Sequence, residues 1–176
     1  TIFLTDELRP PSHRTTIGKT APRAPTLPIG IHMNDVDAAE HRIATAQPPG
    51  IVRDDNTVNF LFAGWLVETK GIHRLIEAFI EVHENHSNTR LLIAGTSNDE
   101  SYRQSLHSLV DDAGIGDAVT FLGWRDDMLD VMAASDIYVL PSFTEGVPRS
   151  IVEAMAMGKP VIATTVGGIP SLLGHG

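Results

Sequence analysis

The chain has 176 residues, of which 42% are apolar and 20% charged, so it can form one well-buried domain of ordinary globular composition. It lacks cysteine, which excludes disulfides and cysteine-bound metals, and no apolar run approaches the roughly 20 residues of a membrane-spanning helix. Its net charge of -9, with 15 acidic against 7 basic residues in 59–176, argues against binding to a nucleic acid backbone.

Residues 1–58 are rich in proline and contain few apolar residues at helix or strand spacing. We predict a linker and the remnant of a preceding domain, with a short strand at Ile2–Thr5 and a short helix around Asp35–Thr45. The chain starts at Thr1, and its last segment, Gly168–Gly176, stops just as a helix should begin. We therefore expect a fragment of a longer protein, with the main domain at 59–176 truncated at its end.

From Val58 onward, short apolar runs alternate with amphipathic segments. The expected strands are Asn59–Ala63, Arg90–Ala94, Val119–Leu122, Ile137–Leu140 and Pro160–Thr164. The expected helices are Ile72–Glu84, Glu100–Ala113, Met128–Ala134 and Arg149–Met157. Continuously apolar strands are typical of a sheet covered on both faces, and their alternation with helices predicts an α/β fold with a doubly wound parallel sheet.

In such a sheet, ligands bind beyond the carboxyl ends of the strands. The loops at that edge are expected at Gly64–Gly71, Gly95–Asp99, Gly123–Asp127, Pro141–Pro148 and Thr165–Gly168. All five contain glycine, which lets the backbone approach a ligand closely.

The fourth loop leads into a helix between two glutamates, Glu145 and Glu153. Pro148 suits the first helical position, and Gly158 suits the helix end. The helix start offers free N–H groups to a polar ligand, and the carboxylates are expected to lie on the order of 10 Å apart, too far for a retaining hydrolase pair. Two carboxylates at that distance can each accept hydrogen bonds from a different part of one extended ligand. The alternative is that Glu145 caps the helix and Glu153 lies on its solvent face.

Lys70 follows the first strand of the domain and precedes Gly71 and a new helix. A lysine there can reach a diphosphate as a point charge, although the segment is not a nucleotide-triphosphate P-loop. The alternative is a solvated lysine without a role. Two further glycines, Gly167 and Gly168, mark another loop whose backbone can approach a ligand closely. The G-x-G-x-x-G pattern of dinucleotide-binding domains is absent from the sequence.

Histidines offer weak candidates for metal binding. His83 and His86 have i, i+3 spacing, but they lie at the end of the sheet opposite the expected ligand edge and lack an evident third ligand. His73, beside the Lys70 loop, and His32, in the linker, have no assigned role. We predict no metal site.

Seven segments occur in an order that resembles one enzyme family. They are Phe60–Gly71, Leu91–Gly95, Val119–Gly123, Ala134–Ser142, Glu145–Ala156, Gly158–Ala163 and Gly167–Pro170. Together they resemble the C-terminal domain of group 1 (family 4) retaining glycosyltransferases, which have the two-domain GT-B fold. The resemblance covers residues from about Asn59 to the end, and Leu27–Ile31 is weakly similar to the segment where that family's chain enters its second domain.

The resemblance implies roles for the matching positions. Lys70 would bind the donor diphosphate and offset charge on the leaving group. Glu145 would contact the donor sugar, and Glu153 the ribose hydroxyls. The remaining donor-binding positions are Gly64, Trp65, Gly123, Gly146, Val147 and Pro148. The implied substrate is a UDP- or GDP-linked sugar, and no divalent metal or other cofactor is expected.

One departure concerns Trp65, which stands where the family usually has an arginine that shares the diphosphate with the lysine. A tryptophan cannot donate a bidentate hydrogen bond, so either another cation substitutes or donor binding is weaker. A non-catalytic nucleotide-sugar-binding domain or an inactive fragment is therefore the rival interpretation. A third interpretation, a signalling receiver domain, is not supported, because this chain lacks the cluster of aspartates that such a domain needs at its first strand.

The acceptor-binding domain is expected to be missing. The sequence therefore does not decide whether the acceptor is a saccharide, a lipid-linked glycan or a small molecule. We expect a cytoplasmic protein, at the inner face of the membrane if the missing domain binds there, with a nucleotide sugar as partner and no nucleic acid.

Overall fold

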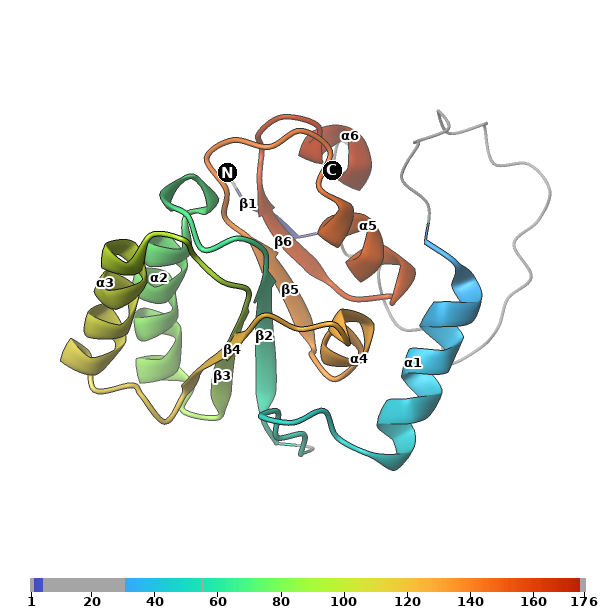
Figure 1. Cartoon of the computed structure of the whole chain (residues 1–176), viewed down its shortest axis with the longest axis horizontal. Helices are drawn as coiled ribbons and strands as arrows, with labels where there is room; N and C mark the ends of the chain where they lie inside the picture. The colour runs from blue at the N-terminus through green and yellow to red at the C-terminus, as the bar shows by residue number, and fades with distance from the viewer. Residues whose placement is uncertain (1, 5–30, 55, 175–176) are drawn as a thin grey trace.

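The structure, a computed structural model, describes residues 2–4, 31–54 and 56–174 (Figure 1). Its elements are β1 (Ile2–Leu4), α1 (Met33–Thr45), β2 (Val58–Ala63), the short 3-10 helix η1 (Glu68–Lys70), α2 (Ile72–Asn85), β3 (Thr89–Ala94), α3 (Glu100–Asp112), β4 (Val119–Gly123), α4 (Met128–Ala133), β5 (Ile137–Leu140), α5 (Arg149–Ala156), β6 (Val161–Thr164) and α6 (Ile169–Leu173). Each strand and helix predicted beyond residue 58 is present, with ends that agree to within one residue. The segment 27–31, which is weakly similar to the one where the family's chain enters its second domain, lies outside the described residues except for Ile31.

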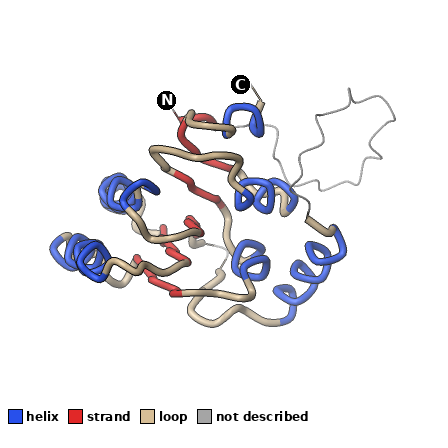
Figure 2. The backbone as a smooth tube through the Cα atoms, turned by 45° about the horizontal axis from the view of Figure 1, so that its top comes forward, coloured by secondary structure: helices blue, strands red, loops and turns tan. Residues whose placement is uncertain are grey.

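The strands form one sheet in the order β1-β6-β5-β2-β3-β4. The five strands from β2 to β6 are parallel, and β1 adds an antiparallel strand at the edge beside β6. Helices α2 and α3 cover one face of this sheet, and α1, α4 and α5 lie on the other (Figures 1 and 2). The predicted doubly wound parallel α/β fold is thus confirmed.

The centre of the sheet is buried on both faces. Leu91, Leu92 and Ile93 are consecutive in β3 and all at most 1% exposed, so the strand shows no alternation of buried and exposed residues. Helix α2 buries Ile72, Leu75, Ile76 and Phe79, which are spaced i, i+3, i+4 and i+7 and form one apolar stripe against the sheet. Burial on both faces explains the continuous apolar runs in the sequence.

The ends of helix α5 depend on two residues with special backbone properties. The helix begins at Arg149, so Pro148 is the extended residue just before it rather than the predicted first helical residue, a shift of one position. At the other end Gly158 adopts a left-handed φ of 62°. Its N–H and that of Lys159 bond to the carbonyls of Met155 and Ala154, which closes the helix as predicted.

Part of the proline-rich segment packs onto the domain. Helix α1 buries Val36 and Ala39 and lies against α4, where Arg42 donates to both carboxylate oxygens of Asp130. None of the described helices combines the length and the apolar character that crossing a bilayer requires.

The packing of α1 is testable with two adjacent alanines. Ala39 is fully buried, whereas Ala38 is exposed on the same helix. Ala39→Leu is expected to lower the free energy of unfolding by about 1–3 kcal/mol because the side chain overfills a packed contact. Ala38→Leu should change it by less than about 0.5 kcal/mol. Denaturant unfolding measures both, and equal effects would mean that α1 does not pack as described.

Candidate functional site

The loops that follow β2 and β5 meet where the chain order of the sheet reverses. Strand β5 pairs with β2, while β3 and β4 continue on the other side of β2. The backbone N–H of Phe143 donates to the carbonyl of Thr69 over 2.8 Å, joining the two loops. Gly71 has a φ of 69°, and a Cβ there would lie 2.4 Å from the carbonyl oxygen of Pro141. Only glycine allows this approach, so backbone packing holds the two loops together.

An ion pair lies at this junction. Nζ of Lys70 is 2.6 Å from Oε1 of Glu145, although the residues are 75 positions apart in the chain. The Ser142 hydroxyl donates to the same carboxylate oxygen over 2.6 Å. The Glu145 side chain is only 8% exposed and that of Lys70 is 26% exposed. The alternative interpretations, a capping Glu145 and a solvated Lys70, therefore do not hold; α5 has no side-chain cap.

A hollow of about 470 Å³ opens beside this ion pair at the carboxyl edge of the sheet. It is lined by Ala63, Gly64, Trp65, Lys70, Ala94, Gly95, Trp124, Arg125, Met128, Glu145, Pro148, Arg149, Ser150 and Glu153. Its lining thus combines the Lys70–Glu145 pair, the start of α5 and two exposed tryptophans, Trp65 and Trp124. We refer to it below as the central pocket.

Bare backbone forms part of the wall of the central pocket. Gly64 and Gly95 follow the neighbouring strands β2 and β3, and a Cβ on Gly95 would lie 1.8 Å from the carbonyl oxygen of Gly64. This contact leaves no space for any side chain at residue 95. A ligand can therefore lie directly against main-chain atoms here.

The second glutamate lies inside helix α5 and faces the same pocket. Glu153 is mostly buried, at 19% exposure, and accepts a hydrogen bond of 2.8 Å from Nε of Arg149, one helical turn earlier. Glu153 is thus a partly buried charge with a partner. The alternative position of Glu153 on the solvent face of α5 does not hold.

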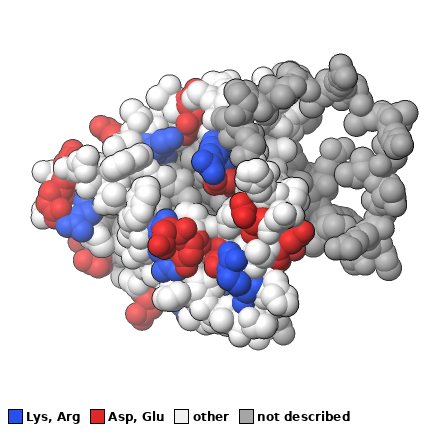
Figure 3. Space-filling model, turned by 45° about the vertical axis from the view of Figure 1, so that its right-hand side comes forward, with Lys and Arg blue, Asp and Glu red and all other residues white. Residues whose placement is uncertain are grey.

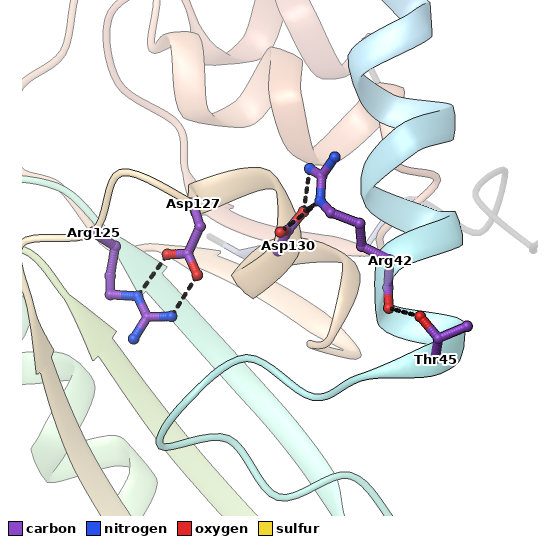
Figure 4. A network of polar contacts seen from close by, with 5 residues as sticks. All are labelled: Arg42, Thr45, Arg125, Asp127 and Asp130. Atoms are coloured by element: carbon purple, nitrogen blue, oxygen red, sulfur yellow. Dashed lines mark hydrogen bonds and ion pairs between the residues drawn. The ribbon is translucent and has the colours of Figure 1, made fainter.

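A second arginine, Arg125, borders the pocket from the loop after β4. It donates to both carboxylate oxygens of Asp127 (Figure 4). It also donates to the carbonyl of Pro49, which ties this loop to the segment after α1. The hydrogen bond from Arg125 lowers the pKa of Asp127 below its usual value. On the face in Figure 3, acidic and basic side chains lie beside one another, and no broad field of one sign is visible.

Six of the nine predicted site residues line the central pocket: Gly64, Trp65, Lys70, Glu145, Pro148 and Glu153. The other three, Gly123, Gly146 and Val147, do not. The carbonyls of Gly123 and Gly146 instead accept hydrogen bonds from the N–H groups of Gly95 and Gly168. Their proposed roles stay predictions.

Sequence reasoning missed several pocket residues: Gly95, Trp124, Arg125, Met128, Arg149 and Ser150. The signal was present, because Gly95, Trp124 and Arg125 lie in predicted strand-end loops. Arg149 and Ser150 lie between the two glutamates. Their side-chain directions depend on helix phase and loop conformation, which spacing alone does not give.

Among the described residues, no three His, Cys, Asp or Glu side chains gather in a way that could hold a metal ion. His83 contacts the Thr89 hydroxyl, and His86 ends helix α2 through its backbone. His73 contacts the Tyr102 hydroxyl rather than the central pocket.

The family profile of glycosyl transferases group 1 matches residues 45–176. The chain belongs to the group 1 glycosyl transferases. The match spans the central pocket and every parallel strand of the sheet. The resemblance on which the sequence prediction depended is therefore confirmed.

Other group 1 and related glycosyltransferases share this domain. An uncharacterized glycosyltransferase of Methanocaldococcus jannaschii is 33% identical over 138 residues, which are 77% of this chain and 34% of that protein. The lipopolysaccharide core biosynthesis glycosyltransferase LpsE of Rhizobium meliloti is 38% identical over 57% of this chain and 28% of its own length. The chain thus spans about a third, or less, of these relatives.

Solved structures place the fold in the C-terminal half of GT-B glycosyltransferases. HepE of Anabaena, in complex with UDP and glucose, superposes with a TM-score of 0.67 at 29% identity, over 84% of this chain and 39% of that one. The C-terminal domain of a group 1 protein from Francisella tularensis, at 23% identity, has the same fold with a TM-score of 0.65 over 81% of this chain and 74% of that one.

Proposed function

We propose that the full-length protein transfers a hexose from a UDP- or GDP-linked sugar to an acceptor, with retention at the anomeric carbon, and that this domain supplies the donor site. The observation that carries the proposal is the Lys70–Glu145 pair beside a pocket that also contains Glu153 and the start of α5. Structures of HepE with UDP and with UDP-glucose, at 28% identity, support a nucleotide sugar as the donor class.

Lys70 acts on the leaving group in this proposal. During transfer the bond between the anomeric carbon and the phosphate oxygen breaks, and the departing diphosphate takes the electron pair. The acceptor oxygen bonds to the anomeric carbon, and its proton neutralises the departing phosphate. An ammonium group beside the developing charge stabilises the transition state, particularly in a site that excludes water. Because an ammonium has three donors, Lys70 can reach a phosphate while keeping its bond to Glu145.

The two glutamates hold different parts of the donor. Glu145 is fixed by Lys70 and Ser142, so its free oxygen has a defined direction for hydroxyl groups of the sugar. Glu153, inside α5, accepts hydrogen bonds from the ribose hydroxyls. We further propose that transfer needs no divalent metal, with cationic side chains and the α5 N-terminus neutralising the diphosphate.

The rival function is nucleotide-sugar binding without transfer, which the tryptophan at position 65 favours. Transfer assays with the full-length protein distinguish the two, because a binding domain releases no nucleoside diphosphate. The acceptor and the cytoplasmic location stay predictions.

Calorimetry with free nucleotides tests the donor site. UDP or GDP is expected to bind the protein with a clearly measurable heat, and Glu153→Gln should weaken that binding by about 10-fold because a charged acceptor of the ribose hydroxyls is lost. Glu100→Gln, an exposed glutamate on α3, is the matched control and should not change binding. Absence of heat with UDP, GDP and ADP would contradict a nucleotide-sugar site.

A further inference from the structure

Three cations line the central pocket, and two of them are already committed to other partners. Lys70 is paired with the buried Glu145. Arg125 donates from Nε and Nη2 to Asp127 and from Nη1 to the carbonyl of Pro49, so all three guanidinium nitrogens have acceptors. Turning Arg125 toward a ligand would break its bonds to Asp127 (Figure 4) and its link to the segment after α1.

Arg149 is held much more loosely. Its contact to the protein is one hydrogen bond, from Nε to Glu153, and its two terminal nitrogens have no acceptor among the described residues. Its side chain is 70% exposed, compared with 15% for Arg125. A pair between residues one helical turn apart, with its arginine in solvent, contributes little stability, so Arg149 can change partner at small cost when the ligand supplies new hydrogen bonds to Glu153.

The position of Arg149 favours an anionic partner. It is the first residue of α5, and neighbouring Pro148 and Ser150 also line the pocket. The first turn of α5 contains no acidic residue, and no side chain caps its N–H groups. The partial positive charge of the helix start is therefore not compensated locally, and it adds to the guanidinium charge.

We infer that Arg149 is the second cation of the diphosphate subsite, and that the Arg149–Glu153 pair opens when the donor binds; this inference rests on the proposed function. The guanidinium turns to the diphosphate, whose oxygens match its planar donor geometry. The same movement frees the Glu153 carboxylate for the ribose hydroxyls. Each half of the pair thus takes one part of the same ligand, and Trp65 provides contact surface without charge.

The test compares UDP with uridine, which lacks the diphosphate, by calorimetry on the full-length protein. Arg149→Ala is expected to raise the Kd for UDP by about 10- to 50-fold and that for uridine by less than about 3-fold. Binding of UDP to the variant should also depend less on salt concentration. Arg103→Ala, which removes an exposed arginine paired with Glu100 on α3, is the matched control and should leave both affinities unchanged.

A second variant tests whether the lost positive charge, rather than the Arg149 side chain as such, explains the weaker binding. Trp65→Arg in the Arg149→Ala background places a cation at the end of β2, and we expect it to recover at least part of the lost UDP affinity. No recovery of UDP affinity would count against a charge effect.

Three outcomes would overturn the inference while leaving the donor site intact. The first is UDP binding by Arg149→Ala as tight as by the unmodified protein. The second is an equal loss for UDP and uridine, which would show an effect on pocket shape rather than on the diphosphate. The third is that Arg125→Ala removes the preference for UDP over uridine while Arg149→Ala does not. If the unmodified protein binds none of the nucleotides, the proposed function itself fails.

Discussion

Replacement of Lys70 by alanine is expected to slow sugar transfer by the full-length protein by about 100- to 1,000-fold. The estimate follows from the loss of one preorganised charge beside a developing anion. Glu145→Ala should have an effect of similar size, because it removes the contact to the sugar and the group that holds Lys70. Release of nucleoside diphosphate, followed at saturating donor, gives the rate.

Loss of folding has to be separated from loss of chemistry. Lys70→Ala leaves Glu145, which is 8% exposed, without its cation, and an unpaired buried charge is destabilising. In the double variant Lys70→Met with Glu145→Gln both charges are absent, so we expect near-normal thermal stability without transfer activity. Full transfer by both Lys70→Ala and Glu145→Ala would place the active site elsewhere.

Gly167→Ala is expected to lower the free energy of unfolding by about 2–4 kcal/mol and to weaken donor binding. Gly167 has a left-handed φ of 55°, and a Cβ there would lie 1.9 Å from the carbonyl oxygen of Glu145. The loop that carries Glu145 would have to move to relieve this contact. Denaturant unfolding and nucleotide calorimetry measure the two effects.

Gly158 is the matched control for this substitution. Its φ of 62° is nearly the same, but a Cβ there has no atom within 4 Å. Gly158→Ala should therefore show only the backbone cost, about 1–2 kcal/mol, with unchanged donor affinity. The difference between the two variants isolates the contact with Glu145, and equal losses would show that this contact is absent in solution.

Much of the fold could be predicted because its signals are local. The apolar run of β3 from Leu91 to Ala94 and the stripe of α2 are properties of short segments, and so is the helix-end signal of Gly158. Each predicted strand of the main domain and each of its intervening helices was correct to within one residue. Pro148 shows the limit of such reasoning, because it lies just before α5 rather than inside its first turn.

The sequence predicted several residues of the site, but not which of them contact one another. Lys70, Glu145 and Glu153 could be identified because each lies at the carboxyl edge of a parallel sheet or at a helix that starts there. Spacing did not indicate that Lys70 and Glu145 contact each other, nor that Arg149 pairs with Glu153. Arg149 was not selected at all, although it lies between the two glutamates.

The sequence by itself determined the order of strands and helices, the edge of the sheet that carries the polar loops, and the family. These follow from local periodicity and from motifs in a fixed order. Only the tertiary structure decided which loops are neighbours: β5 pairs with β2, Lys70 contacts Glu145 across 75 positions of sequence, and α1 lies against α4. Such contacts depend on the order of strands in the sheet and on backbone approaches such as Gly71 to Pro141, which no short segment encodes.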